Sequence, residues 1–169
     1  MVRAVALLAV LASLASAASA RADGDPASDY LLFAPTFVPP DAGIPKAYSD
    51  QLTATVREAK ARGYTIRVAL IGTRYDMGSV TVLYKQPKSY ARFLGTELSL
   101  AYKKPLLIAM PNGLAVSRNG KLLAHEQTLV DGIAPPGDSG IALASSATKA
   151  VLRLAADAGV RLVPCPSRK

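Results

Sequence analysis

The segment YTIRVALI, residues 64–71, has the length and the β-branched composition of a strand. From Ile66 onward it is apolar on both faces except for Arg67, which is typical of a parallel strand buried between two layers. The segment LLIAM, residues 106–110, has the same character and predicts a second buried strand. Two such strands with a helical pattern between them indicate a sheet that is covered on both faces.

Helical patterns flank the two predicted strands. Residues 47–61 place apolar side chains at helical spacing, and Gly63 is the kind of residue that closes a helix. A second helix is expected to begin at Pro87, and a third to span residues 141–158. This alternation predicts an α/β fold, a three-layer α/β/α sandwich with a small, mostly parallel sheet.

The pair Asn119-Gly120 stands between two strand-like runs, residues 114–118 and 121–125. Asn-Gly readily adopts the left-handed backbone of a two-residue turn, so a β-hairpin is predicted here. Residues 160–163 predict a last short strand.

The first twenty residues have the pattern of a secretory signal peptide. Arg3 provides a positive start, a short apolar run follows, and Ala18-Ser19-Ala20 has the small residues of a cleavage site. We therefore expect a secreted, extracytoplasmic protein with no transmembrane segment in the mature chain. The predicted organisation is a signal peptide (1–20), an extended Pro-rich lead (21–46), a single α/β domain (47–163) and a tail (164–169).

The charge balance predicts an anionic partner. The chain has 20 Lys and Arg against 12 Asp and Glu, a net charge of +8, and most positive residues follow residue 50. A nucleic acid is not expected, because no aromatic residues alternate with the basic ones. A solvated surface that only keeps the protein soluble is the alternative. The densest basic stretch runs from Arg57 to Lys104. We expect it to form a basic surface for an anionic cell-envelope polymer or an envelope protein, with Arg74, Lys85, Lys88 and Arg92 as the binding residues.

Polar residues follow both predicted strands, where ligands lie in open α/β sheets. Thr73, Arg74, Asp76 and Ser79 come after the first strand, and Asn112 comes after the second. Asp76 is a candidate ligand for Ca²⁺ or Mg²⁺, and Arg74 a candidate group for holding a phosphate or carboxylate. Alternatively, Asp76 and Ser79 cap the loop or a helix start. A metal site would also need Asp131 or Asp138 to approach Asp76, which the sequence leaves open.

The only other catalytic pattern is GDSG at residues 137–140, which together with His125 and Asp131 follows the order of a chymotrypsin-like triad. We reject this function, because that triad is assembled from distant parts of two barrels. Ser139 or Asp138 is expected to cap the third helix, and His125 to be exposed. No catalytic residue is predicted.

One cysteine and one histidine exclude a disulfide framework, a cysteine-rich zinc site and a cage of several histidines. Cys165 lies between two prolines near the end of the chain. It either pairs with another chain or is an idle thiol.

The segments SDQLTATVREAKARG, TIRVALI and LLIAMPNGLAVSRNG follow one another, with a predicted helix between the last two. In this order, residues 47–118 resemble the TPM domain, the thylakoid-lumen phosphatase-like family. The resemblance implies an α/β/α sandwich outside the cytoplasm. Some members of that family are weak acid phosphatases or bind a divalent ion, and others act as assembly or accessory factors.

Three functional hypotheses follow. The leading one is a binding or accessory domain without catalysis, because no nucleophile, base and acid can be assembled from motifs. The alternative is a weak, divalent-metal-assisted phosphatase of TPM type, with Asp76 as the Ca²⁺ or Mg²⁺ ligand and Arg74 on the phosphate. In the third, the lead around Tyr30 and Phe33 docks the protein as an accessory subunit.

Overall fold

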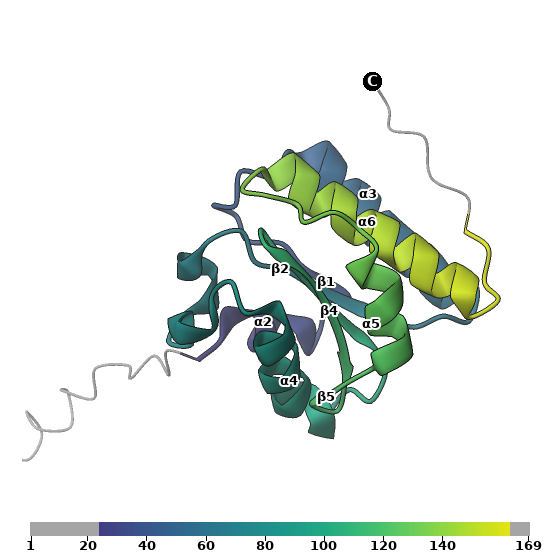
Figure 1. Cartoon of the computed structure of the whole chain (residues 1–169), viewed down its shortest axis with the longest axis horizontal. Helices are drawn as coiled ribbons and strands as arrows, with labels where there is room; N and C mark the ends of the chain where they lie inside the picture. The colour runs from purple at the N-terminus through teal and green to yellow at the C-terminus, as the bar shows by residue number, and fades with distance from the viewer. Residues whose placement is uncertain (1–23, 163–169) are drawn as a thin grey trace, which may run out of the picture.

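The computed structural model describes residues 24–162 (Figure 1). The predicted signal peptide and the tail with Cys165 lie outside the described residues. A five-stranded sheet, in the order β1-β2-β3-β4-β5, lies between two layers of helices. Within the described residues, no helix is long and apolar enough to cross a membrane.

The sheet is mixed. Strands β1 (Thr36–Phe37), β2 (Arg67–Leu70) and β3 (Leu106–Met110) are parallel to one another. Strands β4 (Gly113–Arg118) and β5 (Lys121–Leu122) continue the sheet antiparallel. The two buried strands expected from the sequence are confirmed, and so is the α/β class. The sheet is mixed rather than mostly parallel, because chain reversals after β3 and β4 add two antiparallel strands.

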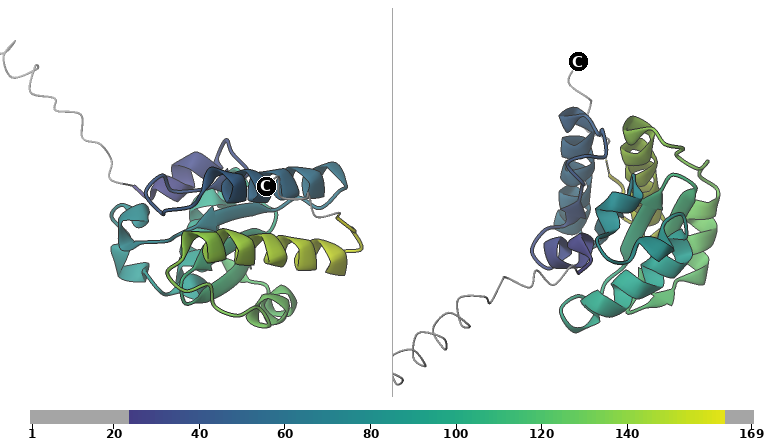
Figure 2. Two further views of the ribbon diagram at one scale, coloured as in Figure 1. Left: turned by 90° about the horizontal axis from the view of Figure 1, so that it is seen from above. Right: turned by 90° about the vertical axis from the view of Figure 1, so that its left-hand side faces the viewer.

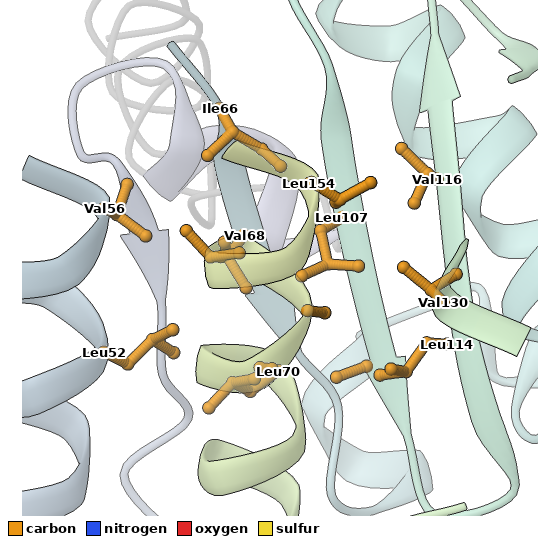
Figure 3. Close-up of a cluster of buried hydrophobic side chains, with 14 of the residues drawn as sticks. Leu52, Val56, Ile66, Val68, Leu70, Leu107, Leu114, Val116, Val130 and Leu154 are labelled. Carbon is orange, nitrogen blue, oxygen red and sulfur yellow. The ribbon is translucent and has the colours of Figure 1, made fainter. Parts of the chain in front are cut away.

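One face of the sheet is covered by α3 (Lys46–Ala61), α5 (Ala124–Asp131) and α6 (Gly140–Asp157). Figures 1 and 2 show α3 and α6 side by side over this face. Every second residue of the central strands points into this layer. Figure 3 shows these side chains meeting the helices, with Val68 and Leu70 from β2, Leu107 from β3, Leu52 and Val56 from α3, and Leu154 from α6.

The opposite face is covered by α2 (Pro26–Leu31) and α4 (Pro87–Glu97). The intervening residues of the same strands, such as Ala69 and Ile108, are fully buried in this second core. Three short 3₁₀ turns complete the layer: η1 (Arg74–Met77), η2 (Thr81–Leu83) and η3 (Leu98–Leu100). The strands are therefore buried on both sides, which explains their lack of polar alternation.

The two parallel crossovers have opposite hands. β1, β2 and β3 are neighbours in that order, so both connections step across the sheet in the same direction. The first crossover, through α3, covers one face, and the second, through α4, covers the other. Two equal steps over opposite faces cannot share a hand, so one of them departs from the right-handed rule.

Residues 24–45 are not an extended lead, as the sequence analysis expected. They form α2 and β1, and Leu31 and Phe37 are buried in the second core. Proline did not prevent the helix, because Pro26 occupies the first turn, where no backbone donor is needed. Asp25 starts the helix by accepting a hydrogen bond from the backbone N–H of Ala27 at 3.1 Å.

The predicted hairpin is confirmed at Asn119-Gly120, where both residues have positive φ and Arg118 pairs with Lys121. Its second strand is shorter than predicted. Helix α5 begins at Ala124, so His125 lies on a helix. The strand predicted over 160–163 is absent from its described part, residues 160–162. These residues follow Gly159 and reach no strand partner.

Candidate functional site

The loops that follow β1, β2 and β3 meet the N-terminus of α6 around a cavity of about 240 Å³, which we call the carboxyl-end cavity. Its position is the one expected for a ligand site in an open α/β sheet. Two carboxylates and two hydroxyls line it, from Asp41, Asp138, Thr73 and Ser139. Of the residues predicted at this edge, Thr73 is the one that lines the cavity.

Glycines keep the carboxyl-end cavity small. A Cβ on Gly140 would lie 2.6 Å from the carbonyl oxygens of both Ala42 and Gly43. The loop after β1 therefore packs directly on the first turn of α6. Ser139 caps this helix by accepting a hydrogen bond from the Ala142 N–H at 3.4 Å, as the sequence predicted.

Asp76 is buried beside the carboxyl-end cavity and holds the loop after β2. Its Oδ2 accepts hydrogen bonds from the N–H groups of Gly72 at 2.8 Å and Thr73 at 2.7 Å. This is the capping arrangement that the sequence analysis gave as the alternative to a metal ligand. Tyr84 supports the same loop by donating to the Gly72 carbonyl at 3.0 Å. The metal role of Asp76 stays a prediction.

Asp138 and Asp76 lie on the same side of the molecule, around Tyr84. Burial raises the pKa of Tyr84, and the two carboxylates add to the rise. Asp131 lies elsewhere, where it accepts from Lys88 at 3.4 Å. Among the described residues, no group of three or more acidic, histidine or cysteine side chains lies close enough together to hold a metal ion.

The remaining predicted residues do not join the carboxyl-end cavity. Arg74 and Ser79 are exposed on the η1 turn and just after it. Asn112 donates to the Lys85 carbonyl at 2.6 Å and lies beside Lys88 in another cavity of about 450 Å³. The predicted basic surface is therefore spread over several segments, and the charge of Lys88 is compensated by Asp131.

A different group of cations comes together at the amino ends of β1, β2 and β3. They line a pocket of about 490 Å³ whose floor is partly apolar, with Pro35, Val56 and Ile66. No acidic residue of the described chain lines it. We call it the basic pocket; its cations are Arg57 and Lys60 on α3, Arg67 at the start of β2, and Lys103 and Lys104 before β3.

Arg67 is the most constrained cation of the basic pocket. Its guanidinium lies over the Tyr102 ring, 4.1 Å from the centroid, and its Nη2 donates to the Leu32 carbonyl at 3.2 Å. Its Nη1 is buried and has no hydrogen-bond partner within residues 24–162. Burial lowers the pKa of Arg67, yet a guanidinium stays charged. The Arg67 guanidinium is therefore a fixed positive charge at the wall of the basic pocket, and it favours an anionic ligand there.

No family model matches this chain, and neither the curated proteins nor the solved structures contain a match. The resemblance to the TPM domain therefore stays an expectation.

His125, Asp131 and Ser139, which follow the order of a triad in the sequence, make no hydrogen bonds to one another in the described chain. His125 lies 2.9 Å from Asp157 on the surface, and Ser139 caps α6. Asp131 accepts from Gln127 at 2.7 Å as well as from Lys88. The residues of the GDSG motif form the loop before α6 and the start of that helix.

The sequence analysis included Arg57, Arg67 and Lys104 in its basic stretch but did not predict that they line one pocket. The local signal for the pocket was Arg67, the one charge in a buried strand. The other cations come from segments about forty residues apart in the chain, and only parallel pairing of β2 with β3 brings them together.

Proposed function

We propose that this protein is an extracytoplasmic binding or accessory domain that holds an anionic partner in the basic pocket and carries out no catalysis. The observation that supports this proposal is that five cations, Arg67 and four others, line the basic pocket with no acidic lining residue among the described residues. Like charges repel one another, so such a group favours an anionic ligand that neutralises it. The partner that this pocket favours is an anionic component of the cell envelope.

Two quadruple variants test which surface binds. Arg57→Glu, Lys60→Glu, Lys103→Glu and Lys104→Glu reverse four charges of the basic pocket and leave Arg67 in place. The matched control reverses the surface predicted from the sequence, with Arg74→Glu, Lys85→Glu, Lys88→Glu and Arg92→Glu. Both change the net charge equally, and all eight side chains are exposed.

The measurement is calorimetric titration of each protein with a soluble poly(glycerol phosphate). We expect the first variant to lose affinity by about tenfold or more and the second to change it little, since the attraction depends on local charge density. The affinity should fall with rising ionic strength. Equal losses of affinity in both variants would show that binding depends only on net charge. A loss of affinity in the second variant alone would show that the partner binds the surface predicted from the sequence.

A second candidate function is a divalent-metal-assisted phosphatase at the carboxyl-end cavity. The observation in its favour is that Asp41 and Asp138 line the cavity together with the hydroxyls of Thr73 and Ser139. Hard cations such as Mg²⁺ or Ca²⁺ prefer oxygen ligands of this kind. Asp76 would then position the loop after β2, and Arg74 is exposed on the η1 turn that follows this loop.

This activity is measured as hydrolysis of p-nitrophenyl phosphate with Mg²⁺ or Ca²⁺ added. Asp138→Asn is expected to abolish it, while Asp157→Asn, which changes a distant surface carboxylate, leaves it intact. Equal rates in wild type and Asp138→Asn would exclude the cavity as the catalytic site.

A further inference from the structure

Two large apolar side chains stand out of the surface beside the basic pocket. Phe33 is 92% exposed and lines the pocket, and Leu100 is 96% exposed and precedes Ala101, which also lines it. Tyr30, 55% exposed, shares a neighbouring hollow with Phe33. Single apolar residues are common on surfaces, but Phe33 and Tyr30 share one hollow next to the cations, and an apolar patch of this kind marks an interaction site.

Both apolar residues are held on short, anchored turns. Phe33 follows α2, whose last residue Leu31 is fully buried, and the Phe33 N–H donates to the Tyr30 carbonyl at 3.2 Å. Leu100 ends η3, whose first residue, Leu98, is buried. The fold therefore presents these side chains outward at a small cost in conformational entropy on binding.

Arg67 connects the apolar group to the cations. Its Nη2 donates to the carbonyl of Leu32, the residue before Phe33, while its Nη1 is unpaired. This hydrogen bond therefore ties the Arg67 guanidinium to the turn that carries Phe33. The exposed cations around them, Arg57, Lys60, Lys103 and Lys104, have no ion pair in the part of the chain that is described.

We infer that this end of the molecule docks on an anionic phospholipid bilayer, with a headgroup phosphate in the basic pocket and Phe33 and Leu100 in the membrane interface. The inference rests on the proposed function and names its partner. A soluble polymer would use the cations but leave the apolar side chains in water. A bilayer uses both, and peripheral attachment generally needs two such signals.

The first experiment measures sedimentation of the protein with phosphatidylcholine vesicles that do or do not contain phosphatidylglycerol. Phe33→Ser with Leu100→Ser is expected to lower binding to the anionic vesicles about tenfold, because the apolar signal is lost. The matched control is Tyr75→Ser with Val82→Ser, which removes two other exposed apolar side chains, 85% and 77% exposed, and should bind like wild type.

Binding of the same proteins to poly(glycerol phosphate) separates the two proposals. The Phe33 and Leu100 variant should keep its affinity for the polymer, whereas the basic-pocket charge reversal should lose both partners. Wild type that binds the polymer and not the anionic vesicles would overturn the lipid inference alone. Wild type that binds neither would overturn both proposals.

A second readout reports insertion directly. The chain has no tryptophan, so Phe33→Trp introduces a single fluorescent reporter. We expect its emission to shift to the blue with anionic vesicles and to be quenched by brominated lipids, while Tyr75→Trp shows neither. An unshifted Phe33→Trp spectrum on bound protein would overturn insertion.

Discussion

The hydroxyl of Tyr90 donates to both carboxylate oxygens of Asp25, at 2.7 and 2.8 Å, although the two residues lie 65 positions apart. Asp25 is 4% exposed and also caps α2. The pair therefore attaches the N-terminal helix to α4 through a buried hydrogen bond. It also places an ionisable group in the core, so the stability of the protein should depend on pH.

Stability should fall as the pH rises through the titration of Asp25. Burial raises its pKa from 3.8 to about 6, and the Tyr90 hydrogen bond opposes the rise. The native state therefore keeps this proton up to about pH 6, whereas the unfolded chain releases it near pH 4. The free energy of unfolding should drop by about 3 kcal/mol across that window. Urea unfolding of wild type and Asp25→Asn measures it, and the drop should be absent in the variant, whose amide oxygen can still cap α2.

Tyr90→Phe should make stability depend more strongly on pH, whereas Asp25→Asn should remove this dependence. The variant lacks the donor to a buried carboxylate, so the pKa of Asp25 should rise further. The free energy of unfolding should fall by about 1–3 kcal/mol at neutral pH. The same urea experiment applies. A Tyr90→Phe protein as stable as wild type at neutral pH would contradict the importance of this bond.

Gln127 should protect the edge of β4. It is buried, accepts from the Val116 N–H at 3.1 Å and donates to the Leu114 carbonyl at 3.0 Å. Gln127→Leu leaves both backbone groups without these partners, which should cost about 2–4 kcal/mol. It should also expose an edge that pairs with other chains. Chemical unfolding and light scattering measure the two effects; Thr128→Ala, at the next and exposed position, serves as the control and should change neither.

Gly140→Ala should destabilise the protein, although alanine is the better helix former. Helix propensity alone would predict a gain of about 0.5–1 kcal/mol. The new Cβ would instead meet the carbonyls of Ala42 and Gly43 at 2.6 Å, so we expect a loss of about 1–3 kcal/mol. Ile141→Ala, at the neighbouring exposed position, is the control. Thermal unfolding shows whether Gly140→Ala lowers or raises the stability. A stabilised variant would show that the loop after β1 can move to make room for the new Cβ.

Asp76→Ala should cost stability whether or not a metal is present. It removes the acceptor for the N–H groups of Gly72 and Thr73, at about 1–3 kcal/mol. Thermal unfolding with EDTA, Ca²⁺ or Mg²⁺ is the measurement, with Ser79→Ala as the control. A metal-specific rise in the wild-type midpoint that Asp76→Ala abolishes would support the metal role predicted from the sequence.

Local signals were sufficient for much of the fold and little of the site. The helix predicted over 47–61 is α3, the one predicted over 141–158 is α6, and α4 begins at Pro87 as expected. Ser139 caps its helix as predicted, because capping depends on neighbours in sequence. The extended lead was wrong, since α2 depends on burial against α4 and on the distant hydroxyl of Tyr90.

The sequence by itself determined the helices, the two buried strands and the Asn119-Gly120 turn, because periodicity and turn conformation act over a few residues. Only the tertiary structure decided which positive side chains lie together in the basic pocket. The parallel register that sets Arg67 opposite Leu106 brings the starts of both strands together, and with them Lys103 and Lys104. Electrostatic attraction depends on distance in space, so a binding surface built from separate segments becomes visible only once the sheet has formed.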